Sequence, residues 1–386
     1  MSGAALAADV MVIGAGIAGA SAAYHLAGEF RVVVLEREDV PGYHTTGRSA
    51  ASFTENYGND TIRKLTRASR DFFESPPVGF ATHPLLAPRS IVTIARSDQL
   101  EALELAFQRA RETSPTVRRL TVDEVVRGIP IIRREYLSAG FFDAACRDID
   151  VHAVHQGFLR GARARGCQLV CNAEIIGLAM NGGLWHAETR AGPVTARFVV
   201  NAAGAWCDKI AELADAQPIQ LVPKRRTAVT IDVPVDVSGW PMVEDANEGF
   251  YFKPEAGRIL ASPGDETPME PCDVQPDELD VAVTIDRLER ATTLSIRRIS
   301  HRWAGLRSFV ADRTPVVGFD PARSGFFWLA GQGGYGIATA PALGRTTASL
   351  IANGRLPADL VDLGLHPRDL APERLGGGSP GRANAD

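Results

Sequence analysis

The sequence has few cysteines and no arrangement of them that indicates a metal site or a disulfide framework. It contains 5 cysteines, an odd number, and none forms a Cys-X-X-Cys pair. This pattern is typical of a cytosolic protein with reduced thiols. The run of Asp148, Asp150, His152 and His155 also resembles a metal cluster, but Asp150 is better explained as the cap of a helix that starts at Val151. Both histidines are then expected on the helix surface, and we expect no metal and a cytoplasmic location.

A basic stripe and a long apolar run are also missing. The formal net charge is -5, so nucleic acid is not an expected partner. Residues 3–24 are mostly small and apolar, but no Lys or Arg precedes Arg31 and Asp9 interrupts the run. A targeting peptide needs a basic start, so none is expected. No other stretch has the length of a membrane span, so no transmembrane segment is expected either.

The 386 residues are enough for about two domains with sizeable cores. A Pro-rich stretch, residues 75–88, marks one crossing between them. The first domain is expected to comprise residues 1–85, 148–222 and 310–372. The second is expected to comprise residues 86–147 and 223–309, and residues 373–386 are predicted to form a disordered tail.

The strongest local signal lies near the N-terminus. An apolar run at 9–13 leads into the glycine-rich segment 14–19, then an Ala-rich helical segment and a second apolar run that ends in Glu36. In Gly14-Ala-Gly16-Ile-Ala-Gly19, the first glycine permits a tight turn, the second lets a pyrophosphate approach the backbone, and the third lets the helix pack on the strand. The helix N-terminus then binds the pyrophosphate and Glu36 the ribose. This context predicts a dinucleotide site, NAD or FAD, rather than a helical hairpin or membrane anchor.

Periodicity predicts the other elements. Helices are expected at 60–73, 99–111, 150–166, 277–292 and 337–353, and strands at 91–95, 168–170, 185–189, 198–200 and 326–330. Within 222–309, short β-runs at 226–233, 249–253 and 258–262 alternate with turn residues. This block predicts a mostly antiparallel sheet with one covering helix. Two further strands run into small-residue turns, at 201–206 and 331–336, where the backbone can approach a ligand closely.

Three glycine-bearing strand-to-helix turns in this order resemble the D-amino-acid oxidase family of FAD enzymes. The matching segments are GAGIAG (14–19), LERE (35–38), VVNAAGAW (199–206), WAGLRSF (303–309) and QGGYGI (332–337). Within the family the chain looks most like the bacterial D-arginine and D-amino-acid dehydrogenase branch, because it also matches at GYHTTGRSAA (42–51), PKRRTA (223–228) and FYFKP (250–254). The resemblance implies an α/β fold of the glutathione-reductase type, with a Rossmann-like FAD-binding domain and an interleaved α+β substrate domain.

The same resemblance implies the residues that contact FAD. They are Gly14, Gly16, Ile17, Ala18, Gly19, Glu36, Arg37, Thr46, Gly47, Arg48, Ser49, Ile175, Ala203, Gly204, Trp206, Gly333, Gly334, Tyr335, Gly336, Ile337, Ala338 and Thr339. The last segment lies beside the isoalloxazine, where a helix dipole stabilises negative charge on the reduced flavin. Some relatives bind FAD covalently through a C-terminal cysteine. No cysteine follows Cys272, so noncovalent FAD is expected.

A flavin that oxidises an amino acid requires the substrate carboxylate to be held firmly, and guanidinium groups do this best. Arg225 and Arg226 are adjacent in a strand and point to opposite faces, so one of them can enter the site. The family match selects Arg226, with Arg307 as the second clamp and Tyr251 as a phenolic donor. A backbone carbonyl near Gly334 is implied as the acceptor for the amine. The alternative is that both arginines are ordinary surface residues.

The expected substrate pocket departs from the D-arginine enzymes. Its predicted residues are Ser52, Phe53, Thr54, Tyr57, Ser90, Met242 and Glu244. The D-arginine enzymes carry histidine, tyrosine and an acid at positions 52, 53 and 90, and loss of that acid removes the partner of a cationic side chain. We therefore expect a substrate other than D-arginine. Glu244 is hypothesised to meet an amine or hydroxyl on the substrate; the alternative is a solvated loop acid.

The predicted reaction is hydride transfer from Cα of a D-amino acid to flavin N5. The imino acid product then hydrolyses to a 2-oxo acid and ammonia. One alternative is oxidation of secondary amino acids such as opines or N-methyl amino acids, with the chain acting as a subunit of a larger complex. Another is a non-catalytic flavin-binding partner protein. The electron acceptor, oxygen or a quinone-like compound, is left open.

Overall fold

The computed structural model describes residues 6–376. Most of the tail predicted to be disordered lies outside these residues, but its first part does not: a short 3-10 turn, Pro372–Leu375, ends the described chain. The other 3-10 turns are η1 (Thr46–Arg48), η2 (Ser97–Gln99), η3 (Arg134–Tyr136), η4 (Gly204–Trp206) and η5 (Pro367–Asp369).

The first sheet has eight strands in the order β10-β11-β12-β1-β2-β9, with β20 and β19 continuing from β12. Its members are β1 (Leu6–Ile13), β2 (Val32–Leu35), β9 (Gln168–Val170), β10 (Ile175–Asn181), β11 (Leu184–Thr189), β12 (Val194–Asn201), β19 (Val316–Phe319) and β20 (Phe326–Ala330). Strands β9, β2, β1, β12 and β20 run parallel. Their carboxyl ends therefore share one edge, which is where α/β sheets bind ligands.

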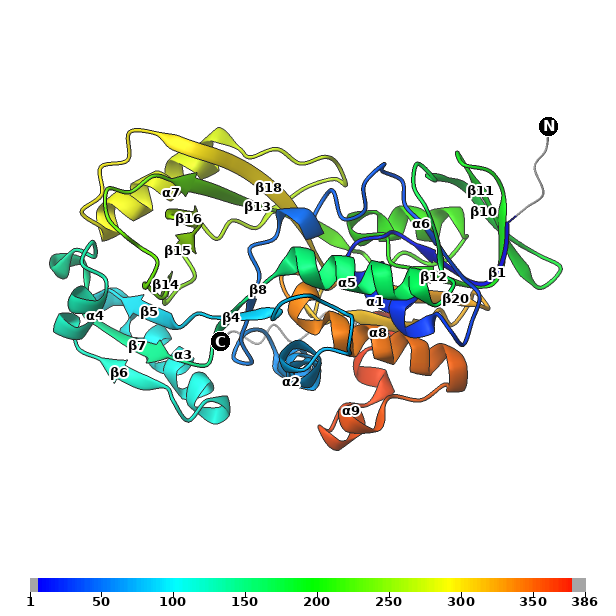
Figure 1. Cartoon of the computed structure of the whole chain (residues 1–386), viewed down its shortest axis with the longest axis horizontal. Helices are drawn as coiled ribbons and strands as arrows, with labels where there is room; N and C mark the ends of the chain where they lie inside the picture. The colour runs from blue at the N-terminus through cyan, green and yellow to red at the C-terminus, as the bar shows by residue number, and fades with distance from the viewer. Residues whose placement is uncertain (1–5, 377–386) are drawn as a thin grey trace.

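Alternating side chains give this sheet two apolar faces. Val10 and Val12 of β1 pack on one face, while Met11 and Ile13 pack on the other. The first face is covered by α1 (Ile17–Leu26), α5 (Val151–Ala164) and α8 (Gly336–Asn353), which lie together in Figure 1, and the second by α6 (Cys207–Leu213). Helix α2 (Asp60–Glu74) packs against α8, and α9 (Ala358–Asp362) packs against α2.

The second sheet has nine strands in the order β17-β13-β16-β15-β14-β5-β7-β6, with β18 paired to β13. They are β5 (Ile91–Ala95), β6 (Arg118–Leu120), β7 (Ala139–Asp143), β13 (Val222–Ile231), β14 (Met242–Asp245), β15 (Tyr251–Glu255), β16 (Arg258–Ser262), β17 (Thr267–Pro268) and β18 (Ile299–Phe309). Only the β14–β5 pair among them is parallel. The predicted mostly antiparallel sheet is confirmed, and α7 (Glu278–Ala291), α3 (Leu100–Thr113) and α4 (Val122–Gly128) pack on it.

A small third sheet lies where the chain passes between the two large ones. It comprises β3 (Ser52–Phe53), β8 (Arg147–Ile149) and β4 (Leu86–Pro88). The carboxylate of Asp148 in β8 accepts from Arg89 Nε at 2.7 Å and from Lys253 Nζ of β15 at 2.9 Å. Ion pairs thus tie the second sheet to the crossing segments. The division into two domains at residues 86, 148, 223 and 310 stays a proposal that this arrangement supports.

Candidate cofactor and substrate site

A cavity opens at the carboxyl edge of the first sheet and continues to β13, β15 and β18 of the second. The glycine turn after β1 forms one wall. Gly14 has φ +99°, and a Cβ there would lie 2.5 Å from Ala202 O. A Cβ at Gly19 would lie 1.8 Å from Gly14 O. Side chains are excluded at both positions, so α1 starts directly against the strands, as the motif predicts.

Glu36 is fixed at the end of β2 by backbone donors. One carboxylate oxygen accepts from Ala15 N at 2.9 Å and the other from Glu38 N at 3.0 Å. The side chain is 7% exposed and lines the cavity. Each carboxylate oxygen keeps a further lone pair, so Glu36 can still accept hydrogen bonds from a ribose.

The loop after β2 closes over the helix N-terminus. Thr46 Oγ1 accepts from Ile17 N at 3.0 Å, which occupies one of the free donors of α1. His155 of α5 makes a 2.7 Å hydrogen bond from Nε2 to Ala15 O, and a Cβ at Gly42 would lie 2.9 Å from the His155 ring. His155 is therefore buried, which corrects its expected surface position; His152 is exposed. The α5 periodicity places His155 on the same face as buried Phe158 and Ala162, a signal that helix spacing offers.

His44 was missed by sequence reasoning although it lies in the matched segment 42–51. Its Nε2 is 2.8 Å from Glu38 Oε1, its ring packs 4.6 Å from the Trp206 ring, and it lines the cavity. Its Nδ1 is buried and has no hydrogen-bond partner within residues 6–376. Arg37 stacks on the same Trp206 ring at 4.8 Å. An orphaned polar atom beside the Trp206 ring in the cavity wall fits a bound nucleotide, so the residues present suit FAD.

Arg48 lines the cavity but directs its guanidinium away from it. The group donates to Val274 O at 2.9 Å and Ala304 O at 3.0 Å, and pairs with Asp273. Arg48 thus fastens the cofactor loop to the second sheet. Arg48 therefore positions the loop beside the dinucleotide, because its guanidinium is already paired and does not offer a free charge to the ligand.

Two arginines of the second sheet enter the cavity. Arg226 and Arg307 stand on the same face of the β13–β18 pair and both line the cavity, together with Tyr251. Arg226 donates from Nε to Asp265 O at 2.8 Å. Arg225 points to the opposite face, where it pairs with Asp280 at 2.7 Å. The two neighbours therefore diverge as the strand geometry predicts.

The arginine pair lies in an excess of positive charge. Glu266 lies 3.6 Å from Arg226, but it also pairs with Arg313 at 2.7 Å and Lys224 at 2.9 Å. Within the described chain, no carboxylate forms an ion pair with Arg307. Burial and the nearby Arg307 guanidinium lower the pKa of Arg226, whereas the Tyr57 and Tyr251 phenols and the Glu266 carboxylate raise the pKa of Arg307 against the effect of burial. An anionic ligand would relieve this repulsion.

The turn before α8 approaches the arginines closely. Gly333 has φ +54°, and a Cβ there would lie 2.3 Å from the Phe309 ring. A Cβ at Gly334 would lie 3.0 Å from Arg307 Nη1. These glycines let the backbone of the turn lie directly against the guanidinium, so an amine held at Gly334 and a carboxylate held at Arg307 would be adjacent.

None of the predicted substrate-pocket residues lines the cavity. Tyr57 packs 4.9 Å from Tyr335, and Thr54 Oγ1 accepts weakly from Asn56 N at 3.4 Å. Ser52 Oγ lies 4.0 Å from Met242 Sδ. Phe53 differs from expectation: it is 5% exposed and packs in the core against Phe73, because β3 turns its ring inward.

Ser90 and Glu244 flank β5 on the far side of this region. Ser90 contributes its carbonyl, which accepts from Met242 N at 2.9 Å. Glu244 is half-buried and accepts from Thr93 Oγ1 at 2.9 Å. Burial raises the pKa of Glu244 to about 7, and the Glu248, Asp143 and Asp245 carboxylates add to this. Glu244 is therefore not a fully solvated loop acid, but it does not line the cavity, and its contact with a substrate stays a hypothesis.

Most of the predicted cofactor residues line the cavity; Gly19, Gly47, Tyr335, Ala338 and Thr339 lie behind its wall. Sequence reasoning missed other lining residues, among them Tyr43, His44, Thr45, Lys209, Ile210, Leu213, Leu306, Ser308 and Gln332. Several of them lie within the segments that match the family (42–51, 303–309 and 332–337), so the family resemblance could have identified them. Within residues 6–376 there is no group of metal-binding side chains, and no helix is long and apolar enough to cross a bilayer.

This fold and cavity define a flavoprotein that binds FAD at the glycine turn of an α/β sheet. The chain belongs to the family described as FAD dependent oxidoreductase, whose model matches residues 9–350. FAD is therefore its cofactor. The family match does not single out the D-arginine dehydrogenase branch, which stays a prediction.

Three similar proteins illustrate the range of the family. Human mitochondrial dimethylglycine dehydrogenase is 25% identical over 92% of this chain, and the chain spans 44% of that protein's length. Glycine oxidase from Bacillus licheniformis is 25% identical, with 92% of this chain and 95% of the relative covered. The crystal structure of glycine oxidase from Geobacillus kaustophilus has a TM-score of 0.78 at 21% identity and covers 91% of this chain and 96% of that one.

Proposed function

We propose that this protein oxidises the C–N bond of a small amino acid whose carboxylate is held by Arg226 and Arg307. The observation that carries the proposal is the pair of guanidinium groups on one face of β13 and β18, with no carboxylate in ion-pair contact with Arg307 among residues 6–376. Guanidinium binds a carboxylate through two parallel hydrogen bonds, which fixes its orientation.

The remaining groups in the cavity suit this role. Tyr251 can donate its hydroxyl to the same carboxylate, and the turn at Gly334 can receive the amine. Bound FAD supplies the acceptor for the hydride that leaves Cα. The protein's task is then to hold the carboxylate and the neutral amine so that the Cα hydrogen faces the flavin. Without a cysteine after Cys272, we propose that FAD is held noncovalently.

A D-amino acid is the substrate that the sequence resemblance favours. It would yield an imino acid, and water would convert this to a 2-oxo acid and ammonia. The similarity to dimethylglycine dehydrogenase favours a second candidate, a glycine-like amino acid with a substituted nitrogen. The two candidates share the carboxylate clamp and differ at the nitrogen.

Anaerobic mixing of the yellow holoprotein with amino acids tests the proposal. The panel contains D- and L-amino acids, glycine, N-methylglycine and N,N-dimethylglycine, and the flavin absorbance near 450 nm is followed. Loss of absorbance with D-amino acids supports the first candidate, and loss with the substituted glycines alone supports the second. If no member bleaches the flavin, the proposal is refuted and a flavin-binding partner without turnover becomes the better explanation.

A further inference from the structure

The face of the second sheet that carries the arginines also carries Glu244. Glu244 is the direct cross-strand neighbour of Tyr251, and opposed residues of an antiparallel pair project to the same face. Met242, two residues earlier, touches Ser52 of β3, and Lys253, two residues after Tyr251, pairs with Asp148 of β8. This face therefore points at the crossing between the sheets, and Tyr251 on the same face lines the cavity.

One carboxylate oxygen of Glu244 accepts a hydrogen bond, and the other has no hydrogen-bond partner among the described residues. Thr93 Oγ1 donates to Glu244 Oε1 at 2.9 Å, and no described Lys or Arg forms an ion pair with Glu244. Lys253, a cation on the same face, is bound to Asp148 at 2.9 Å. A partly desolvated carboxylate without a cationic partner is costly, which is the condition that a cationic ligand relieves.

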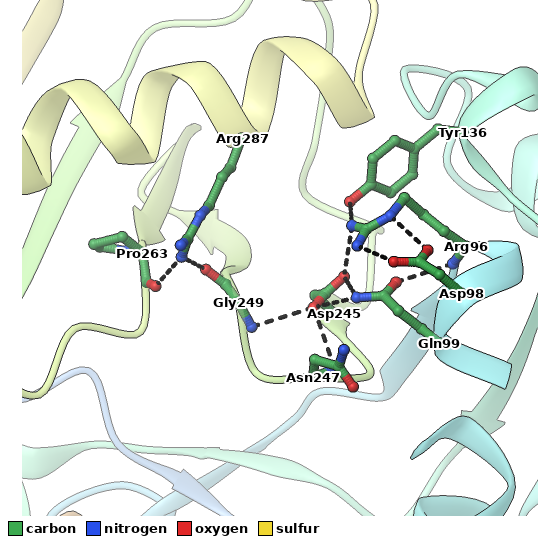
Figure 2. A network of polar contacts seen from close by, with 9 residues as sticks. All are labelled: Arg96, Asp98, Gln99, Tyr136, Asp245, Asn247, Gly249, Pro263 and Arg287. Atoms are coloured by element: carbon green, nitrogen blue, oxygen red, sulfur yellow. Dashed lines mark hydrogen bonds and ion pairs between the residues drawn. The ribbon is translucent and has the colours of Figure 1, made fainter. Parts of the chain in front are cut away.

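Several hydrogen bonds hold the β14–β15 hairpin, in which Glu244 lies. Figure 2 shows the adjacent Asp245, on the opposite face of β14, receiving hydrogen bonds from Gln99 Nε2 at 2.9 Å and from Asn247 N and Gly249 N at 3.2 Å. Arg287 of α7 donates to the carbonyls of Gly249 and Pro263. The β14–β15 hairpin is thereby tied to two helical regions, so Glu244 and Tyr251 keep a fixed spacing.

On this side of the second sheet, the Arg226 and Arg307 guanidinium groups and the Glu244 carboxylate have opposite charges. Burial raises the pKa of Tyr57, the Arg307 and Arg226 guanidinium groups oppose the rise, and the Glu248 and Glu244 carboxylates add to it. Tyr57 packs 4.9 Å from the Tyr335 ring, in the turn whose Gly334 lies against Arg307, while Glu244 lies opposite Tyr251 on β15. A ligand with a carboxylate at one end and a cation at the other would match both ends.

We propose that Glu244 is a specificity-determining residue that binds a second, positively charged nitrogen of the substrate, at the end opposite to the carboxylate clamp. The inference rests on the proposed function and names its substrate class: amino acids that carry an additional ammonium group. Because Thr93 occupies Oε1, the oxygen that remains suits a compact ammonium better than the two-pronged guanidinium of arginine. A cationic substrate is therefore compatible with this site, although D-arginine is still not the expected substrate.

Binding of unreactive ligands to the holoprotein tests this directly. The probes are straight-chain ω-amino acids of four to six carbons and the unsubstituted carboxylic acids of equal length, which lack an α-amine. Their dissociation constants are measured from changes in the flavin absorbance spectrum at pH 8. At least one ω-amino acid should bind about tenfold tighter than its matched acid, and Glu244→Gln should bring this ratio to about one.

Two further variants sharpen the outcome. Glu270→Gln removes an exposed acid of the same sheet region and should leave the ratio unchanged. Glu244→Asp withdraws the carboxylate by one methylene and should shift the preference to a ligand one carbon longer. Equal binding of both ligand series, or a ratio that survives in Glu244→Gln, would overturn the inference.

Failure of the inference can be told apart from failure of the proposed function. If amino acids bleach the flavin of the wild-type protein, while no ω-amino acid binds more tightly than its matched acid, the function stands and the Glu244 subsite is refuted. If no carboxylate changes the spectrum and no amino acid bleaches the flavin, both are refuted together. Equal flavin content and equal melting temperatures establish that each variant is folded.

Discussion

Arg225 and Arg226 are adjacent residues of the same type that have different roles. Strand alternation sends Arg225 to Asp280 and Arg226 into the cavity. The first is neutralised by its carboxylate, and the second shares Glu266 with two other cations. A cation that faces a cavity without a carboxylate of its own can bind an anionic ligand. A cation that is neutralised by its own carboxylate has a structural role.

Substitution of the two arginines should therefore give opposite results. Arg226→Lys loses the two-pronged contact with the substrate carboxylate, so kcat/KM should fall about 10- to 100-fold, the equivalent of roughly 1.5–3 kcal/mol. Arg225→Lys is the matched control and should change kcat/KM less than about threefold. Steady-state kinetics with the best amino acid measures both. An equal loss in the two variants would contradict the assignment of Arg226 to the clamp.

Ionisation of Glu244 should make ligand preference depend on pH. Its pKa is raised to about 7 by burial, with Glu248, Asp143 and Asp245 adding to the effect and Thr93 opposing it. Below pH 7 the carboxyl is increasingly protonated and loses its attraction for ammonium. The preference for an ω-amino acid over its matched acid should therefore rise between pH 6 and pH 8. A flat ratio across this range, measured by spectral titration, would argue against an ionising Glu244.

The helix α5 connects sequence pattern to cofactor binding at the scale of an element. Its Asp150 cap was predictable, and the Asp150 side chain accepts from Ala153 N at 2.8 Å. The inward direction of His155 required tertiary information, because its partner is Ala15 O, far away in the chain. The hydrogen bond holds the glycine turn in place.

Removal of this bond should weaken FAD binding. His155→Ala leaves Ala15 O without its partner, so the Kd for FAD should rise about 3- to 10-fold, which corresponds to roughly 1 kcal/mol. His155→Gln retains a donor and should restore most of the affinity. His152→Ala, on the exposed side of the same helix, is the control. Fluorescence titration of the deflavinated protein gives the three constants, and equal values would refute a role for His155.

Elements with strong periodicity or glycine turns were predictable, and short ones were not. The predicted helix at 60–73 is α2, and the strand at 258–262 is β16. Strands β6 and β8 have three residues each and lie within segments without a clear period, so tertiary pairing defines them. Helix α4 was missed although Thr121 and Glu124 form a capping box that its sequence displays.

The candidate site divides in the same way. The cofactor cradle is built from local turns, so its glycines and Glu36 could be read from the chain. The arginine pair depends on the register of β13 with β18, and the position of Glu244 depends on its pairing with both Thr93 and Tyr251. Such register is set by the whole sheet, which explains why the family resemblance was needed to select these residues.

At the scale of the whole molecule, two buried histidines link folding to pH. Burial lowers the pKa of His25 to about 3 and lowers that of His155 as well. His25 therefore stays neutral in the folded protein down to about pH 3, whereas histidines of the unfolded chain become protonated below about pH 6.5. Their contribution to stability is therefore full above pH 6.5 and is lost as pH falls toward the folded pKa.

Urea denaturation at several pH values should reveal this loss. The free energy of unfolding should fall through His25 by up to about 1.4 kcal/mol per pH unit between pH 6.5 and pH 4, and His155 adds a loss in the same direction. Glu244 acts in the opposite direction, because its raised pKa favours the folded state on acidification between pH 7 and about 4.5. His25→Leu should flatten the loss, and an unchanged slope in that variant would contradict the account.

We expect the arginine clamp to hold an amino acid carboxylate beside the flavin, and the proposed function depends on this contact. Its most direct test is anaerobic flavin reduction of the wild type and Arg307→Lys by the best amino acid and by the amine that lacks its carboxylate. The wild type should be reduced at least a hundredfold faster by the amino acid, and Arg307→Lys should lose most of this discrimination. Equal reduction of the wild type by both compounds would contradict the clamp and the function proposed from it.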